Sequence, residues 1–197
     1  QLFDDYADKF DAALVEKLDY RAPALLADAL RRTLGEVSGL QVMDAGCGTG
    51  LAAPVLRPLA AWLEGVDLSP AMVAKARQRG LYDELREGEL VQALSDSATH
   101  FDLVVAADVL VYLGDLEPVM RAARKALAPG GAFAFTVERC DDVETYVLGA
   151  KSRYAHAEGY VRKVAEQAGF TVALLEQAVT RRDAGADVPG LVAVVRL

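Results

Sequence analysis

Cysteine and histidine are scarce in this chain of 197 residues, which contains two of each. Cys47 and Cys140 lie far apart and match no metal-ligand spacing, so the sequence predicts neither a disulfide framework nor a metal site. An apolar run long enough to cross a bilayer is missing, and so is a recognisable signal sequence. We therefore expect a cytoplasmic protein with no membrane partner.

Basic residues are outnumbered by acidic ones, with 21 Lys and Arg against 29 Asp and Glu, so the net charge is −8. A domain that binds the backbone of a nucleic acid normally presents a basic patch. We therefore expect no nucleic-acid partner. The length, together with 53% hydrophobic residues, suits a globular unit able to bury a real core.

Strands and helices are predicted to alternate along most of the chain. Leucines at helical spacing predict two helices between residues 4 and 34, which would form an N-terminal helical cap over residues 1–36. Residues 37–197 are interpreted as one α/β domain with a doubly wound, mainly parallel sheet. The strands expected in it are residues 40–44, 62–67, 85–93, 101–106, 132–138, 170–179 and 191–197.

The last two expected strands follow each other without an intervening helix. Such a pair forms an antiparallel hairpin, here at the edge of the sheet, with its loop at residues 185–190. Residues 139–157 show the least regular pattern and are interpreted as a flexible connector or lid.

The most informative segment is a glycine-rich turn that follows the first expected strand, with Gly46, Gly48 and Gly50 after the acidic Asp44. Glycine allows positive φ and the close approach of a ligand, and such turns hold nucleotide-like cofactors in α/β folds. The dinucleotide pattern G-x-G-x-x-G fails because its third glycine position falls on Leu51. A carboxylate at Asp44 would also repel a pyrophosphate.

An acidic turn favours a ligand that carries positive charge and no phosphate. S-adenosylmethionine fits this description, because it has a sulfonium and an α-ammonium group. Two other interpretations remain: a nicotinamide-dependent oxidoreductase, disfavoured by Leu51 and Asp44, and a glycine-rich turn that holds no ligand.

A second acidic residue, Asp67, ends the next expected strand and lies 23 positions after Asp44. At about this offset an acid meets the ribose hydroxyls in nucleotide-binding βαβ units. Ser69 and Pro70 suit the cap and first position of the following helix. Met72 on that helix is expected to face the adenosine.

The segments D-A-G-C-G-T-G and G-V-D-L-S-P-A-M resemble motifs I and II of the class I S-adenosylmethionine-dependent methyltransferases. Two later segments, F-D-L-V-V-A-A-D-V-L-V-Y-L-G-D-L and L-A-P-G-G-A-F-A-F, resemble the fourth and fifth strand regions of that family. The resemblance implies a Rossmann-like methyltransferase fold with a seven-stranded sheet and a reversed edge strand. It implies S-adenosyl-L-methionine as the cofactor.

Within that superfamily, the opening L-F-D-D-Y-A-D-K-F-D and the later R-Y-A-H resemble bacterial methyltransferase domains associated with tetratricopeptide repeats. The chain begins at Gln1, so an N-terminal repeat domain is a possible missing partner.

The resemblance also assigns site residues. Glu89 and Leu90 are expected to flank the adenine, and the segment Ala106, Ala107 and Asp108 to meet the methionine end of the cofactor and the substrate. Together, the expected cofactor-binding residues are Asp44, Ala45, Gly46, Cys47, Gly48, Gly50, Asp67, Leu68, Met72, Glu89, Leu90, Ala106, Ala107, Tyr6 and Arg21.

Asp108 and His156 are the candidate catalytic residues. Asp108 could steer an ammonium group or simply cap a helix. His156 could act as a substrate-side base if the segment around it passes over the site, or it could be a surface loop residue. Tyr6 could close over the cofactor or pack on the core, and Arg21 could pair with the cofactor carboxylate or serve the structure.

The sequence thus predicts a methyltransferase that acts on a small molecule or on a protein side chain. The alternative is a catalytically silent module that binds S-adenosylmethionine for assembly or sensing. Methyl transfer requires no obligatory catalytic residue, so the sequence leaves both interpretations open.

Overall fold

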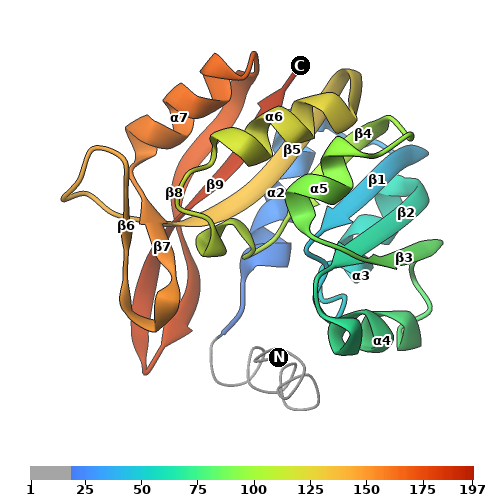
Figure 1. Cartoon of the computed structure of the whole chain (residues 1–197), viewed down its shortest axis with the longest axis horizontal. Coiled ribbons are helices and arrows are strands. Elements are labelled where there is room, and N and C mark those ends of the chain that lie inside the picture. The colour runs from blue at the N-terminus through green and yellow to red at the C-terminus, as the bar shows by residue number, and fades with distance from the viewer. Residues whose placement is uncertain (1–18) are drawn as a thin grey trace.

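The computed structural model of the protein describes residues 19–197, which form a single sheet with helices on both faces (Figure 1). The strands are β1 (Leu40–Ala45), β2 (Ala60–Asp67), β3 (Glu84–Glu87), β4 (Phe101–Ala106), β5 (Leu127–Arg139), β6 (Tyr146–Leu148), β7 (Tyr154–His156), β8 (Thr171–Asp183) and β9 (Ala186–Arg196). The α-helices are α2 (Ala22–Leu34), α3 (Ala53–Leu56), α4 (Pro70–Gln78), α5 (Leu90–Ser95), α6 (Glu117–Ala126) and α7 (Glu158–Gln167). This architecture confirms the predicted α/β fold class.

Five strands follow the order β3-β2-β1-β4-β5, and every neighbouring pair among them is parallel. The chain runs outward in one direction from β1 to β3 and in the other direction from β4 to β5. The strand order therefore reverses between β1 and β4. In open α/β sheets, ligands bind beyond the carboxyl ends of the strands at such a switch point.

The reversed strand is β9, which pairs antiparallel with both β5 and β8. It therefore lies one position in from the edge, and β8 is the edge strand, which corrects the predicted reversed edge strand. The predicted loop at residues 185–190 is also shorter than expected. Ala184 and Gly185 both have positive φ, of 49° and 83°, so two residues close the hairpin in the way that matches the twist of its strands.

Two short strands, β6 and β7, raise the number of strands within residues 19–197 to nine, where seven were predicted. They form an antiparallel hairpin within residues 139–157, the segment interpreted from the sequence as a flexible connector. Glu138 near the end of β5 pairs with Gly190 of β9 and with Ala155 of β7. Since β9 occupies one side of β5, β7 lies on the other side, where β5 extends past the end of β4.

The core has two halves, one on each face of the sheet, because side chains of a strand alternate between its faces. The helices α5, α6 and α7 cover one face (Figure 1), and Phe133, Phe135 and Val137 of β5 are buried there. On the other face, α2 and α3 pack against the small Ala132 and Ala134 of the same strand. Aromatic side chains thus fill the space below one layer of helices, and alanines let the other layer approach closely.

The predicted third strand, residues 85–93, is wrong in its second half. The strand β3 ends at Glu87, and Leu90–Ser95 form α5. Glu89 explains the change, because its carboxylate accepts hydrogen bonds from the backbone N–H of Val91 (3.0 Å) and of Gln92 (2.8 Å). These bonds satisfy two amides that a helix start leaves free.

The helix α2 belongs to the same core as the sheet, since Leu26, Ala29 and Leu30 are buried among strand residues. Of the two helices predicted before residue 35, only α2 falls within the described residues. The predicted division at residue 36 therefore stays a prediction. Across residues 19–197, no helix is both long enough and apolar enough to cross a membrane.

Candidate functional site

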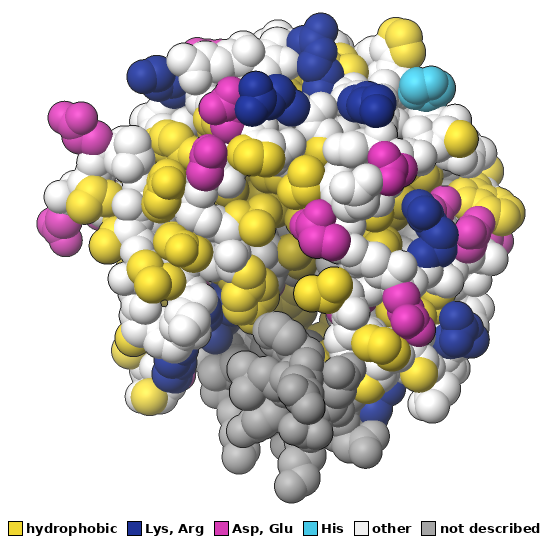
Figure 2. Space-filling view, viewed as in Figure 1, with side chains coloured by type: hydrophobic (Ala, Val, Ile, Leu, Met, Phe, Trp, Pro, Cys, Tyr) yellow, Lys and Arg dark blue, Asp and Glu magenta, His cyan; other side chains and the backbone are white. Residues whose placement is uncertain are grey.

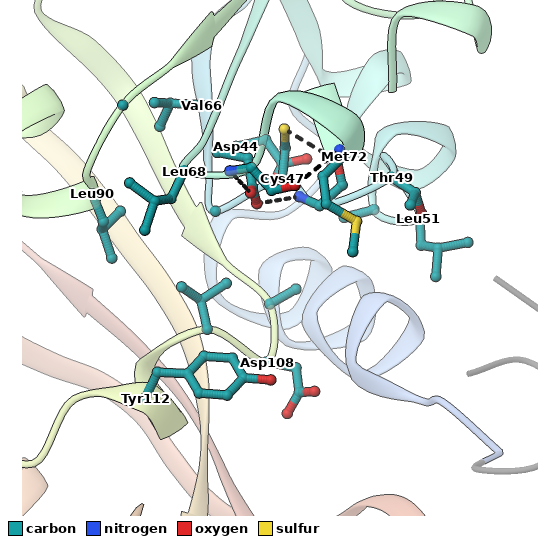
Figure 3. A pocket seen from close by; sticks show the side chains of 18 of the residues that line it. Asp44, Cys47, Thr49, Leu51, Val66, Leu68, Met72, Leu90, Asp108 and Tyr112 are labelled. Carbon is teal, nitrogen blue, oxygen red and sulfur yellow. Dashed lines mark hydrogen bonds between the residues drawn. The ribbon is translucent and has the colours of Figure 1, made fainter. Parts of the chain in front are cut away.

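A pocket of about 300 Å³ opens at the carboxyl ends of β1, β2 and β4, at the switch point of the sheet (Figure 3). Its size and mostly apolar wall suit a small organic ligand. Its lining residues come from five segments of the chain that meet at this edge. They are Tyr20, Asp44, Gly46, Cys47, Gly48, Thr49, Leu51, Ala52, Val66, Asp67, Leu68, Ser69, Met72, Gly88, Glu89, Leu90, Ala107, Asp108, Val109, Tyr112 and Leu113.

The glycine-rich loop is tied to the end of β2 by three hydrogen bonds of its backbone. The N–H groups of Gly46 and Cys47 both donate to the carbonyl of Val66, at 2.8 and 2.9 Å. The N–H of Gly48 donates to Oδ2 of Asp67 at 2.8 Å (Figure 3). The loop is therefore held in one conformation before any ligand arrives.

The three loop glycines all have positive φ, but they face different surroundings. A Cβ at Gly46 would lie 2.6 Å from the methyl groups of Val109, and one at Gly50 would lie 3.0 Å from the side chain of Arg79. A Cβ at Gly48 would meet no atom of residues 19–197 within 4 Å. Gly46 is thus required by packing, whereas Gly48 borders the open space of the pocket, where a ligand would lie.

Asp44 lies at the end of β1, is 1% exposed and lines the pocket. Its Oδ2 accepts a hydrogen bond from the Tyr82 hydroxyl at 2.6 Å. Burial raises the pKa of Asp44 to about 7, the Tyr82 bond opposes that rise, and the negative charge of Asp67 adds to it. A cation placed in the pocket would stabilise the ionised carboxylate. This arrangement fits a ligand with a positive charge, as the sequence predicted.

Asp67 lies at the end of β2, as predicted, and connects two loops. Its Oδ1 accepts from the N–H of Ser69 at 2.9 Å, while Oδ2 holds the glycine-rich loop. Ser69 caps α4 by accepting from the N–H of Met72 at 3.3 Å, and Pro70 begins the helix, so both expectations are confirmed. Met72 is buried and lines the pocket beside Asp67.

Leu68, Glu89 and Leu90 form the outer wall of the pocket next to Asp67. Leu68 is 72% exposed, so a large apolar side chain faces solvent at the rim. Glu89 uses both carboxylate oxygens to cap α5, and its contact with an adenine remains a prediction. The side chains of Ala45 and Ala106 pack into the core on the α6 side and do not line the pocket.

Asp108 faces the pocket from the opposite end, together with Ala107 and Tyr112 (Figure 3). The expectation that it caps a helix is wrong, and its role toward an ammonium group stays a prediction. The residue that caps the short helix at Leu110–Tyr112 is Val109, and the Asp108 carboxylate is paired with the guanidinium of Arg153 at 2.5 Å. Burial raises the pKa of Asp108, and Arg153 opposes that rise.

His156 lies in β7, is fully buried and does not line the pocket, so the proposed role as a substrate-side base is wrong. Its Nε2 lies 3.0 Å from the carbonyl oxygen of Gly114, and its ring stacks on Tyr160. Burial lowers the pKa of His156, so the ring is neutral near pH 7. Its function is to pack the hairpin of β6 and β7 against α7.

Arg21 also lies away from the pocket. Its guanidinium is exposed and paired with Asp19, and its backbone N–H donates to the carbonyl of Thr180 at 3.0 Å. The predicted contact with a cofactor carboxylate is therefore not supported. Tyr6 lies outside the described residues, and its predicted role stays a prediction.

Three functional residues were missed from the sequence. Tyr20 lines the pocket and donates from its hydroxyl to the carbonyl of Ala107 at 3.3 Å. Tyr82 donates a hydrogen bond to the carboxylate of Asp44, and Arg153 donates one to the carboxylate of Asp108. No local pattern marks any of them, because each meets its partner across 38 to 87 positions of the chain.

One face of the molecule shows no charged patch that would mark a second site. On the face seen in Figure 2, basic and acidic side chains intermingle and no large area carries one sign. Within residues 19–197, no group of three or more His, Cys, Asp and Glu side chains is placed to hold a metal ion.

Comparison with known proteins agrees with this geometry. A family model described as "Methyltransferase domain" matches residues 18–175. A ubiquinone biosynthesis O-methyltransferase of Xanthomonas oryzae pv. oryzae is 33% identical over 109 residues, which are 53% of this chain and 46% of that protein. The protein of the same name from Methylocella silvestris is 36% identical over 136 residues, 61% of this chain and 51% of that protein. The chain spans about half the length of these curated relatives.

Solved structures share the fold. A Burkholderia thailandensis 1,6-didemethyltoxoflavin-N1-methyltransferase, with bound 1,6-didemethyltoxoflavin and S-adenosylhomocysteine, superposes with a TM-score of 0.74 at 20% identity. The match covers 99% of this chain and 86% of that one. A putative methyltransferase complexed with the Haloferax volcanii Trm112 methyltransferase activator gives a TM-score of 0.75 at 20% identity, over 98% of this chain and 96% of that one.

The two loop glycines should respond differently to substitution. Gly46→Ala places a Cβ against Val109 on a residue with φ of 72°, so we expect a loss of about 2–4 kcal/mol in the free energy of unfolding. Gly48→Ala meets open space and carries only the cost of positive φ, about 1–2 kcal/mol. Urea unfolding of both variants measures the difference. Equal losses would mean that Gly46 does not pack as described.

Proposed function

We propose that this chain, which belongs to the methyltransferase domain family, binds S-adenosyl-L-methionine in the pocket and transfers its methyl group to an acceptor. The observation that carries the proposal is the buried Asp44 beside the open face of Gly48. Burying the Asp44 carboxylate is costly even with the Tyr82 hydrogen bond, and an ammonium or sulfonium group in the pocket would offset that cost. A phosphate in the same place would increase it.

The residues of the pocket fit the parts of this cofactor. Asp44 and the glycine-rich loop would hold its amino-acid end, and Asp67 its ribose, because each Asp67 oxygen has a lone pair left beyond the one backbone bond it accepts. Leu68, Leu90 and Met72 offer apolar walls for the adenine. When bound, the cofactor supplies an activated methyl group and a good leaving group.

The protein would then contribute by holding the acceptor in line with the methyl group and by excluding water. Proximity of this kind accounts for a large part of the rate in such transfers. The far end of the pocket, around Asp108 and Tyr112, is the place that remains for the acceptor.

The acceptor that we favour is a small molecule. The curated relatives are named for ubiquinone biosynthesis and one structural neighbour for 1,6-didemethyltoxoflavin, and both names denote small molecules. A protein acceptor, a cytoplasmic and bacterial setting, and an association with tetratricopeptide repeats stay predictions from the sequence.

Calorimetry with S-adenosylhomocysteine tests the proposal directly. We expect binding of one molecule per chain, and no heat from NADH under the same conditions. Binding of NADH alone, or of neither compound, would contradict the proposal. A protein that binds S-adenosylhomocysteine could still fail to convert S-adenosylmethionine into S-adenosylhomocysteine with any of a broad set of acceptors. That result would instead favour the silent binding module.

Asp44 predicts a pH dependence of cofactor affinity. The pKa of Asp44 in the free protein is about 7, and a bound ammonium group lowers it, so binding releases a proton at acidic pH. Affinity for S-adenosylhomocysteine should therefore fall by up to roughly tenfold for each pH unit below 7 and stay constant above it. Calorimetry from pH 5.5 to 8.5 measures this. Asp44→Asn keeps the shape of the side chain and should bind S-adenosylhomocysteine weakly at every pH. If that variant showed the pH profile of the wild type, Asp44 would not be the group that controls the affinity.

Asp67→Ala should weaken binding of S-adenosylhomocysteine by about 1–3 kcal/mol through the loss of charged hydrogen bonds. Because Asp67 also holds Gly48, the ribose contact needs a separate control. The 2′-deoxy analogue of the ligand should bind the wild type more weakly than the parent ligand does. In Asp67→Ala, the 2′-deoxy analogue and the parent ligand should bind with equal affinity. A persisting difference in the variant would assign the ribose to another residue.

A further inference from the structure

One carboxylate, that of Asp108, lies at the acceptor end of the pocket. Four of the residues that line the pocket are carboxylates, Asp44, Asp67, Glu89 and Asp108, and among the described lining residues none is Lys, Arg or His. The first three lie on the glycine-loop side and belong to the site proposed for the cofactor. Asp108 is the only one of the four at the far side, next to Tyr112 (Figure 3).

Asp108 is held in an uncommon conformation. Its φ is 57°, in the left-handed region that a residue with a Cβ rarely adopts, and its N–H donates to Oγ1 of Thr136 at 2.9 Å. Such strain persists only where the surroundings impose it, and it concentrates at functional sites. The Asp108 carboxylate is directed by this backbone toward both the pocket and Arg153. Its Oδ1 accepts from Arg153, and Oδ2 has no hydrogen-bond partner among the described residues.

Arg153 reaches this place from the hairpin of β6 and β7, the part of the sheet that the sequence did not predict. It is 6% exposed and makes three side-chain contacts at once. Its guanidinium donates to Asp108 at 2.5 Å, to Glu138 at 2.6 Å and to the Tyr112 hydroxyl at 3.2 Å. It also lies 5.4 Å from the centre of the Tyr112 ring, within the range of a cation–π contact.

We propose that Arg153 is a positioning residue for the methyl acceptor, holding Asp108 and Tyr112 in place so that Asp108 accepts the proton of an N–H or O–H acceptor that carries no negative charge. The inference rests on the proposed methyl transfer and names the acceptor class for the same pocket. Arg153 itself does not line the pocket, so it acts through Asp108 and Tyr112, which do.

The step balances as a simple displacement. A lone pair on the acceptor nitrogen or oxygen forms the new bond to the methyl carbon, and the bond from that carbon to sulfur breaks with its electron pair left on sulfur. The acceptor proton passes to Oδ2 of Asp108. General-base assistance of this kind is useful when the acceptor arrives protonated.

The acceptor class follows from charge. An acceptor with a carboxylate or phosphate would place a second negative charge beside Asp108 in a pocket whose described lining offers no cation to pair with it. A neutral ring or an ammonium group has no such cost. Tyr20 and Tyr112 border the same space and offer hydroxyl groups and aromatic surface.

Several groups determine the protonation of Asp108. Burial raises its pKa; Arg153 lowers it by charge and by its hydrogen bond, Arg181 from β8 lowers it, and Glu138 from β5 raises it. Tyr112 and Tyr20 lie beside it as neutral hydroxyls, since burial raises the pKa of both. Removing Arg153 therefore removes the main effect that opposes burial and Glu138, so the pKa of Asp108 should rise.

The first test measures Asp108 itself and needs no acceptor. The carboxyl carbon signal of Asp108, identified by its absence in Asp108→Asn, is titrated by NMR. In Arg153→Met its midpoint should rise by about one to three pH units, and in Arg153→Lys by less. Lys151→Met is the matched control, because Lys151 is on the same hairpin, is exposed and pairs with Asp183 on the surface. The control should titrate as the wild type does.

An unchanged midpoint in folded Arg153→Met would overturn the positioning role. Circular dichroism checks folding, because removal of one partner from a buried pair is destabilising. Should Arg153→Met fail to fold, Arg153→Lys decides alone: its single ammonium cannot replace all three contacts, so a wild-type midpoint would overturn the proposal.

The second test uses catechol, dopamine and 3,4-dihydroxybenzoate, which share a ring and differ in charge. Catechol or dopamine should be methylated with kcat/KM at least about tenfold above that of the benzoate. Asp108→Asn should lower kcat on the preferred acceptor by about a hundredfold or more without changing the affinity for S-adenosylhomocysteine. Preference for the benzoate, or no turnover of any of the three, would overturn the acceptor class. If the wild type did not bind S-adenosylhomocysteine at all, that result would instead contradict the proposed function.

Discussion

The attachment of the glycine-rich loop to the end of β2 is the constraint on which the site depends. The Val66 carbonyl accepts two loop N–H groups and the Asp67 carboxylate accepts a third, so these three bonds oppose movement of the loop away from β2. This attachment directs the open side of Gly48 into the pocket and leaves Asp44 at its base. It is possible only because β1 and β2 are parallel neighbours whose carboxyl ends lie side by side.

Burial of acidic groups sets the electrostatics of the pocket. Asp44 has lost almost all contact with water and keeps one hydrogen bond, from Tyr82, so its charge is costly until a cation arrives. Asp108 at the other end is only partly buried, and Arg153 compensates its charge. The two ends thus differ: one is prepared for a positively charged ligand, and the other already has its counter-ion inside the protein.

The length of β5 connects the hairpin of β6 and β7 to this chemistry. Because β5 continues beyond the last residue of β4, its exposed edge can pair with β7 close to the mouth of the pocket. Glu138 on that extension then binds both Arg153 and Arg181. In this way an addition to the sheet, outside the five strands around the switch point, reaches the far end of the pocket. This is the end where we propose that the acceptor binds.

The sequence by itself determined the elements with a local signal: the glycine-rich turn, the acids that end β1 and β2, the Ser69 cap and the alternation of strands and helices. These depend on residues close together in the chain, where periodicity, capping and turn preferences act. Only the tertiary structure decided that Arg153 would meet Asp108 and that Tyr82 would meet Asp44. It also decided that His156 would be buried and that Arg21 would lie outside the pocket. Those outcomes depend on strand pairing and burial across 38 or more positions, and no local pattern of the chain encodes which distant side chain fills the space beside a buried charge.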